Sequence, residues 1–286
     1  MKTTMKNLKK IIALLVLLVS ITISAQSING KAHYVVKNTV KMNFGNREIP
    51  EDRKAMIQQQ INKMSTNNFV LTFDKNSSLY AEEEKLEQDQ GHAMFSQRLG
   101  MMKMMLNQGS NGKLYKNSSD SAYKNQSDLY GKLFLIEDTL QKIEWQITDD
   151  VKTIGKHTCF KATTRLENKD LPANFGPGQQ IDDGEKPQEF ANEMIIVTAW
   201  FTLDIPVSQG PGMYYGLPGL ILEVNAGNTT ILCSKIELYK ETRTISPPKK
   251  GKKINQEKYD ALIKKKAKEI RENFRRGRGG LERRSN

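Results

Sequence analysis

The chain reads Gly-Pro-Gly-Met-Tyr-Tyr-Gly-Leu-Pro-Gly-Leu-Ile-Leu-Glu-Val between Gly210 and Val224, and this is its most distinctive stretch. Pro218 fixes φ near the value that the second position of a tight turn requires. Gly219 can supply the positive φ of the third position of a type II turn. We therefore expect a sharp bend at this pair. The alternation from Leu220 to Val224 then predicts a strand with one buried face.

A second strand is predicted at residues 195–202, which are rich in β-branched and aromatic side chains. Prolines and glycines make the connection between the two strands irregular. Such a connection is either a structural corner, the commoner meaning of a Pro-Gly turn, or a binding loop on a rigid scaffold. As a binding loop, its candidate residues are the aromatic residues and the turn itself: Trp200, Tyr214, Tyr215, Gly216, Leu217, Pro218 and Gly219.

These residues resemble the signature of the GLPGLI family, which takes its name from the hexapeptide at 216–221. Further stretches that resemble family positions are Leu140–Trp145, Ile154–Gly155, Cys159–Thr163, Thr198–Thr202, Ile205–Pro206, Gly210–Pro211 and Pro248–Lys253. The resemblance therefore covers most of the chain after residue 25. It implies an exported, β-rich bacterial protein without an established biochemical activity, and it brings no catalytic residues with it.

Residues 1–25 are typical of a secretory signal peptide, with a basic start, an apolar run from Ile11 to Ile23 and the small residue Ala25 before the cut. The apolar run is shorter than the roughly 20 residues that span a bilayer, and no comparable run follows. The cleavage site has no cysteine, so a lipid anchor is not expected. We therefore expect export to the periplasm, the outer membrane or the medium, without an integral membrane helix.

The formal net charge is +12, and the basic residues are concentrated at the two ends of the chain. The body between residues 26 and 248 carries a slight excess of acidic residues, so a nucleic-acid partner is not expected. The tail, 249–286, is predicted to form a lysine-rich helix at 255–276 followed by a disordered end. We interpret it first as a solvated helix, with docking to an acidic partner or to an anionic membrane as the alternatives.

Many short strands separated by turn signals predict one mainly β domain over residues 26–248. The preferred architecture is a curved antiparallel sheet or half-barrel that holds a helix in its concave face. A helix is expected to open at Pro50, and residues 167–189 are expected to form a long surface loop. Strands are expected at Ala32–Phe44, Asn68–Lys75, Ser78–Glu82, Asp120–Asp128, Gly131–Glu137, Ile143–Thr148, Gly155–Leu166, Met194–Leu203, Leu220–Val224 and Thr229–Tyr239.

Cys159 and Cys233 are the only cysteines, and both fall in predicted strands. An oxidising compartment would allow a disulfide between them, whereas two buried thiols packed as small apolar groups are the alternative. The sequence leaves both possibilities open, because a disulfide needs Cα atoms within about 7 Å of each other.

Soft metal ligands are gathered in one short segment, which contains His92, Met94, Met101, Met102, Met104 and Met105. Thioethers suit Cu(I), so a methionine-based copper protein is one alternative function. Methionine is also a flexible filler of apolar surfaces, and no cysteine or paired histidine fixes a metal geometry here. The preferred interpretation therefore expects no cofactor.

The chain shows no acid/base carboxylate pair, nucleophile elbow, zinc-protease helix or phosphate-binding glycine loop. An unrecognised hydrolase is therefore only a further alternative. The preferred function is an exported, non-catalytic binding or accessory protein. Its partner would be an unknown envelope protein, or a small apolar ligand held on the curved sheet. An apolar groove of roughly several hundred Å³ would favour such a ligand, and a filled interior would count against it.

Overall fold

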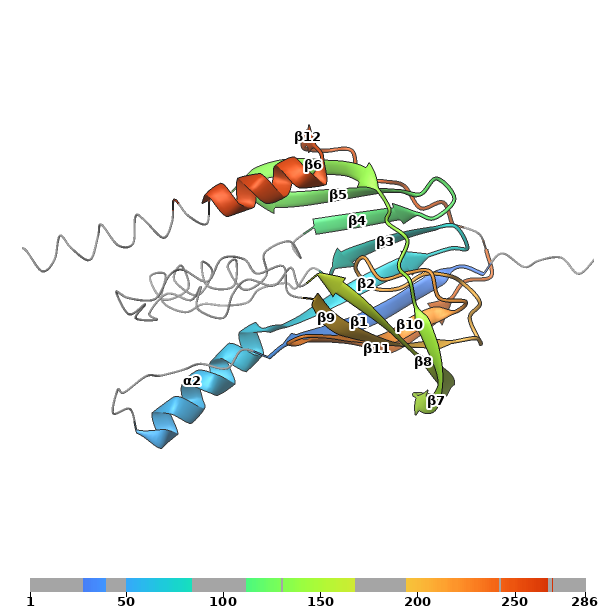
Figure 1. Ribbon diagram of the computed structural model, residues 1–286, viewed down its shortest axis with the longest axis horizontal. Coiled ribbons are helices and arrows are strands. Elements are labelled where there is room, and N and C mark those ends of the chain that lie inside the picture. The colour runs from blue at the N-terminus through green and yellow to red at the C-terminus, as the bar shows by residue number, and fades with distance from the viewer. Residues whose placement is uncertain are drawn as a thin grey trace, which may run out of the picture.

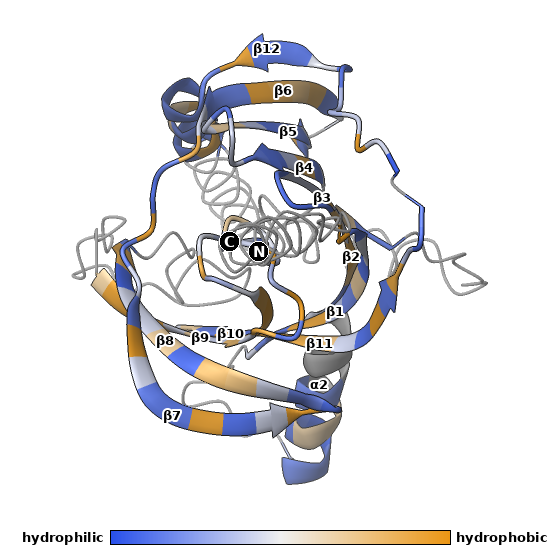
Figure 2. Cartoon of the chain, turned by 90° about the vertical axis from the view of Figure 1, so that its right-hand side faces the viewer, coloured by the Kyte–Doolittle hydropathy of each residue, from blue (hydrophilic) through white to orange (hydrophobic). Residues whose placement is uncertain are grey.

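The computed structural model describes residues 28–39, 50–83, 112–129, 131–167, 194–241, 243–266 and 269. Twelve strands form one sheet in the order β12-β6-β5-β4-β3-β2-β1-β11-β10-β9-β8-β7. All neighbouring strands are antiparallel except β12 and β6, which run parallel. The sheet curves strongly but stays open, with β12 and β7 at its two edges (Figures 1 and 2). The prediction of a mainly β, curved sheet is confirmed.

The strands are β1 (Gly30–Asn38), β2 (Thr66–Phe73), β3 (Ser77–Glu82), β4 (Gly112–Asn117), β5 (Ala122–Leu129), β6 (Lys132–Thr139), β7 (Gln146–Ile154), β8 (His157–Glu167), β9 (Met194–Thr202), β10 (Leu220–Ala226), β11 (Thr229–Leu238) and β12 (Lys252–Ile254). β4 and β12 were not predicted from the sequence, and β7 begins and ends later than the strand expected at 143–148. The other described strands lie close to their predicted positions.

Two helices accompany the sheet in the described residues. α2 (Glu51–Met64) begins directly after Pro50, as predicted, and its first turn carries Glu51 and Asp52, which favour a helix N-terminus. It leads into the beginning of β2 and extends away from the sheet (Figure 1). A second helix covers residues 256–266 and lies alongside β5 and β6. No described helix has the length and apolar character required to cross a membrane.

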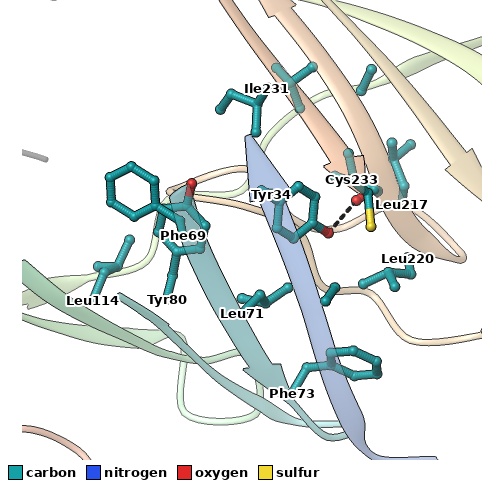
Figure 3. Close-up of a cluster of buried hydrophobic side chains, with 14 of the residues drawn as sticks. Tyr34, Phe69, Leu71, Phe73, Tyr80, Leu114, Leu217, Leu220, Ile231 and Cys233 are labelled. Carbon is teal, nitrogen blue, oxygen red and sulfur yellow. Dashed lines mark hydrogen bonds between the residues drawn. The ribbon is translucent and has the colours of Figure 1, made fainter. Parts of the chain in front are cut away.

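The inner face of the sheet carries the apolar core. Strand alternation and register place Tyr34, Phe69, Leu71, Tyr80 and Leu114 on this face, and all five are buried. The Tyr80 ring stacks on the Phe69 ring at 4.8 Å between centroids and meets the Tyr34 ring edge-on at 6.2 Å. Figure 3 shows this cluster together with residues from β11 and from the loop that precedes β10. The central strands are therefore held together by aromatic packing on one side.

Among the described residues, two segments pack into the inside of the curve. The β9–β10 connection, residues 203–219, contributes Ile205, Val207 and Leu217 to the core, each at most 2% exposed. The helix at 256–266 contributes Tyr259, which is 3% exposed. The expectation of a helix in the concave face is thus met only at the β5–β6 end, because an irregular loop occupies the rest.

Candidate functional site

The connection at residues 203–219, which we call the GLPG loop, closes around one buried lysine. Lys116 lies on the inner face of β4 and is 1% exposed. Its Nζ donates to the carbonyl oxygens of Gly210, Gly212 and Tyr214, at 2.8, 2.7 and 3.0 Å. An ammonium group has three N–H donors, so this cup of carbonyls uses all of them.

The glycines of the loop make that convergence possible. Gly212 has φ +56°, a left-handed conformation that turns its carbonyl toward the lysine at little cost. At Gly210 an added Cβ would lie 2.7 Å from Cδ1 of Ile221 and 2.8 Å from the carbonyl oxygen of Tyr214. A larger residue would therefore displace the carbonyls at Gly210 and would be held in a strained backbone conformation at Gly212.

The charge of Lys116 is compensated by dipoles. No carboxylate among the described residues forms an ion pair with it, and the nearest π-system is the Tyr215 ring, with its centroid 5.9 Å from Nζ. Burial lowers the pKa of Lys116 to about 7, because removal from water disfavours the charged form. The carbonyl dipoles act in the opposite direction and hold the amine in place.

The loop is also tied to residues 140–145, which connect β6 to β7. The indole nitrogen of Trp145 donates to the carbonyl oxygen of Tyr215 at 2.8 Å, and the Tyr215 hydroxyl donates to the carbonyl oxygen of Gln141 at 2.9 Å. Where the loop joins β10, the Tyr34 hydroxyl donates to the carbonyl oxygen of Ile221 at 2.6 Å (Figure 3). Contacts from β1, β4 and the β6–β7 connection therefore fix one loop conformation.

The bend at the Leu-Pro-Gly run is present, but the predicted reason for its glycine is wrong. Gly219 does not have a positive φ; the left-handed residue of this run is Gly216, at φ +93°. Leu220 donates its N–H to Ile205, whereas a type II turn would direct it to Leu217. Gly219 is required because a Cβ there would lie 2.0 Å from the carbonyl oxygen of Thr202.

The structure separates the predicted binding residues into two groups. Within the loop, Leu217 and Gly219 are buried, Gly216 and Pro218 are exposed, and Tyr214 and Tyr215 are half-buried. Met213, which was not among the predicted residues, directly precedes Tyr214 and is 42% exposed. We call Met213, Gly216 and Pro218, together with the exposed edges of the two tyrosines, the loop crest.

Trp200 belongs to a different surface. Strand alternation places it on the face opposite to the buried residues Ala199 and Phe201. There Nζ of Lys152 lies 4.2 Å from the centroid of the Trp200 ring and forms a 2.6 Å ion pair with Glu223. The structure therefore places Trp200 on the opposite face of β9 from the buried core.

The cysteines do not form a reactive centre. Cys159 and Cys233 are both free and buried. Burial raises the pKa of Cys159 to about 11 and that of Cys233 to about 12, which keeps both as unreactive thiols. The imidazole of His157 is paired with Asp204, with Nδ1 2.8 Å from the carboxylate. The thiol of Cys159 donates to the backbone oxygen of His157 at 3.6 Å, and not to its ring.

The copper interpretation rests on residues 92–105, which lie outside the described residues. Within the described part of the chain, no group of three or more His, Cys, Asp and Glu side chains is arranged to hold a metal ion. A shallow, open hollow of about 350 Å³ lies over β3–β6, beside Ala81, Lys113 and Gln126. It is outside the curve of the sheet and does not provide the apolar groove that a carried ligand would require.

Lys116 is the main residue that the sequence analysis missed. Its only signal is its place in the run Gly-Lys-Leu-Tyr-Lys-Asn at 112–117, where it shares a strand face with Leu114. A lysine at a core position looks like a surface residue until its partners are known, and those partners lie in a loop far along the chain.

Comparisons with known proteins agree with the resemblance in the loop region. Residues 145–223 match a family described as a protein of unknown function, Porph_ging, which is of the GLPGLI type. This stretch contains β7 to β9, the GLPG loop and the start of β10. A comparison with curated proteins finds no match.

Solved structures give weak similarities. Two structures of PNGF-II, in the C2 and P21 space groups, have TM-scores of 0.45 at 12% and 13% identity, and cover 82% of this chain. The chain spans about a third of PNGF-II, 32% and 33% of its length in the two structures. LprF from Mycobacterium bovis has a TM-score of 0.26 at 8% identity, covering 78% of this chain and 90% of LprF. At these scores neither protein indicates a function for this chain.

Proposed function

We propose that this protein is an exported, non-catalytic binding or accessory protein of the periplasm or outer membrane that engages its partner on its surface. One observation supports a surface interaction over carriage inside the sheet. In the part of the chain that the structure describes, Ile205, Val207 and Leu217 of the GLPG loop and Tyr259 of the second helix pack into the inside of the curve. Of the two partners considered above, an envelope protein therefore fits better than a small apolar ligand.

The loop crest is the proposed contact surface. Its base is held by Lys116, Trp145 and Tyr215 through hydrogen bonds of 2.7 to 3.0 Å. A loop with such a base loses little conformational entropy on binding, which favours affinity. The crest offers an exposed methionine and proline beside two half-buried tyrosines, a combination of apolar and aromatic groups that is common at interface centres.

Binding of the purified mature protein to envelope fragments from its own source tests this proposal. We expect saturable binding that weakens at least about tenfold in Met213→Ala, because a central apolar anchor contributes on this scale. Met194→Ala is the matched control, since Met194 is also an exposed methionine, at 59% against 42% for Met213. It should bind as the wild type does.

Two results would contradict the proposal. Equal binding by wild type and Met213→Ala would show that the crest is not the contact surface. Recovery of a stoichiometric apolar molecule by solvent extraction of the native protein would show that the interior carries a ligand after all.

A further inference from the structure

The basic segment after residue 248 is built into the sheet. β12 pairs with β6 in parallel, and Gly251 precedes it with φ +124°. A Cβ at Gly251 would lie 2.6 Å from the carbonyl carbon of Phe134 and 2.8 Å from the nitrogen of Leu135. Glycine is therefore the residue that lets this segment approach the edge of the sheet so closely.

The helix that follows is anchored by its apolar side. The Tyr259 hydroxyl lies 2.8 Å from Oγ of Ser127, and its ring meets the Phe134 ring edge-on at 5.7 Å. Leu262 and Ile263 pack against the same core. The thin apolar stripe of this helix is thus directed to the sheet, and it is not available for a membrane or for a protein partner.

Exposed lysines follow one another along this segment, on both faces of β12 and on the helix. Residues 249–266 contain eight lysines and two acidic residues. Seven of the lysines are exposed, and six of these form what we call the basic ridge: Lys249, Lys250, Lys252, Lys253, Lys258 and Lys265. Only Lys253 of these six forms an ion pair within the described part of the chain, at 3.2 Å from Glu137.

Three acidic residues beside the ridge are already engaged, whereas Glu257 is exposed. Glu137 lies between Lys124 and Lys253, and hydrogen bonds from these two lysines hold its pKa below the usual value. Asp138 accepts the N–H of Gln256 at 3.0 Å, where the helix begins, and Asp260 accepts from the Gln256 side chain at 2.6 Å. The ridge therefore keeps a concentrated positive charge, which destabilises a compact state unless a counter-charge binds.

We propose that the basic ridge binds an acidic polysaccharide, with carboxylate groups along the polymer facing the lysines. This surface is distinct from the loop crest, so it goes beyond the function proposed above. A linear, hydrophilic polyanion matches a surface that offers charge and almost no apolar contact.

Other anionic partners fit this surface less well. A peripheral membrane helix directs its apolar side to the lipid, whereas here Tyr259, Leu262 and Ile263 face the sheet. The centres of protein interfaces are poor in lysine and rich in aromatic residues. Single-stranded nucleic acids stack on exposed aromatic rings, and the one aromatic residue in 243–266, Tyr259, is buried.

The experiment measures binding of the mature protein to polygalacturonate at 50 and 250 mM NaCl. Double-stranded DNA and vesicles of phosphatidylcholine with phosphatidylglycerol are tested in parallel at equal ionic strength. We expect binding to polygalacturonate that weakens at least about tenfold at the higher salt concentration, because ions screen and compete for the lysines. The triple variant Lys249→Gln, Lys250→Gln, Lys258→Gln should weaken binding at least about tenfold at 50 mM NaCl.

Two controls make the result specific. The variant Lys75→Gln, Lys142→Gln, Lys156→Gln removes the same charge from three exposed lysines in other parts of the fold and should bind as the wild type does. Replacement of the three ridge lysines by arginine should preserve binding. The proposal is overturned by wild-type binding in the ridge variant, by equal loss in the control variant, or by tighter binding to DNA or vesicles than to polygalacturonate. Circular dichroism confirms that each variant is folded.

Discussion

The GLPG loop and the helix at 256–266 both cover the inner face of the sheet, yet they are stabilised in opposite ways. The helix satisfies its own backbone and needs only Tyr259, Leu262 and Ile263 to attach it. The loop has no repeating hydrogen bonds, so its backbone carbonyls depend on Lys116, which lies on a strand far away in the sequence. The comparison shows that a regular element can be attached by a local pattern, whereas an irregular one requires a donor from elsewhere.

The largest expected effect concerns Gly219, whose φ is not left-handed but whose Cα lies against the backbone of Thr202. Gly219→Ala places a Cβ 2.0 Å from the carbonyl oxygen of Thr202, which is backbone and cannot rotate away. We expect a loss of about 4 kcal/mol or more in the free energy of unfolding, measured by urea denaturation. Gly216→Ala is the comparison: it has φ +93° but open space around its Cα, so the cost should be about 1–2 kcal/mol. Equal effects of the two substitutions would contradict the steric explanation.

An intermediate effect is expected for the lysine that the loop encloses. Lys116→Met keeps much of the apolar volume but leaves the carbonyls of Gly210, Gly212 and Tyr214 without their donor. At pH 9 we expect the variant to be less stable than the wild type by about 2–4 kcal/mol in urea denaturation.

The pH dependence of that difference is the sharper measurement. The pKa of Lys116 is lowered from 10.5 to about 7 in the folded state, so between these values the unfolded chain binds a proton that the folded chain does not. Raising the pH therefore stabilises the wild type relative to Lys116→Met, by up to about 1.4 kcal/mol per pH unit above pH 7. A stability difference that stays constant from pH 7 to pH 9 would show that the carbonyl groups offset burial and that the pKa of Lys116 is not lowered.

The smallest effect is expected at the beginning of the helix. Asp138→Asn removes the charge that accepts the Gln256 N–H, and should cost about 0.5–1 kcal/mol, seen as faster hydrogen exchange in 256–266 with little change in the body. Hydrogen bonds from the backbone N–H groups of Gln256 and Thr139 hold the pKa of Asp138 below its usual value. The stabilisation is thus present at neutral pH and disappears as the pH falls through that lowered pKa.

Asp149→Asn provides the matched control. It removes the same charge from an exposed residue on the edge strand β7. Faster exchange in the helix of this control would contradict a local capping effect.

Local patterns predicted much of the sheet correctly. The β2–β3 hairpin followed from alternation on both sides of a short polar turn, and in the structure Asp74 accepts the N–H groups of Asn76 and Ser77 in that turn. α2 followed from Pro50 and the acidic residues after it. β4 was missed because Lys116 interrupts its apolar face, and β12 because three residues carry too little pattern.

The sequence indicated where the GLPG loop lies, but it did not indicate which contacts hold the loop. The Leu-Pro-Gly run marks the loop correctly. The role of Gly219 depends on the carbonyl of Thr202, which no spacing rule can reveal. Alternation separates Trp200 from Ala199 and Phe201, but which of the two faces is turned to the core is decided only when β9 pairs and packs. Contacts of this kind form only when distant segments meet.

The position of β1 also has a consequence for how the molecule assembles. This strand, near the beginning of the chain, pairs with β2 on one side and with β11 on the other. The first pairing can form early, whereas the second must wait until almost 240 residues are present, as Leu238 is the partner of Gly30. Pairing between such remote strands is slow to find its register. A chain that emerges from its N-terminus would therefore join the two halves of its sheet only late, and β1 would meanwhile expose an unpaired edge.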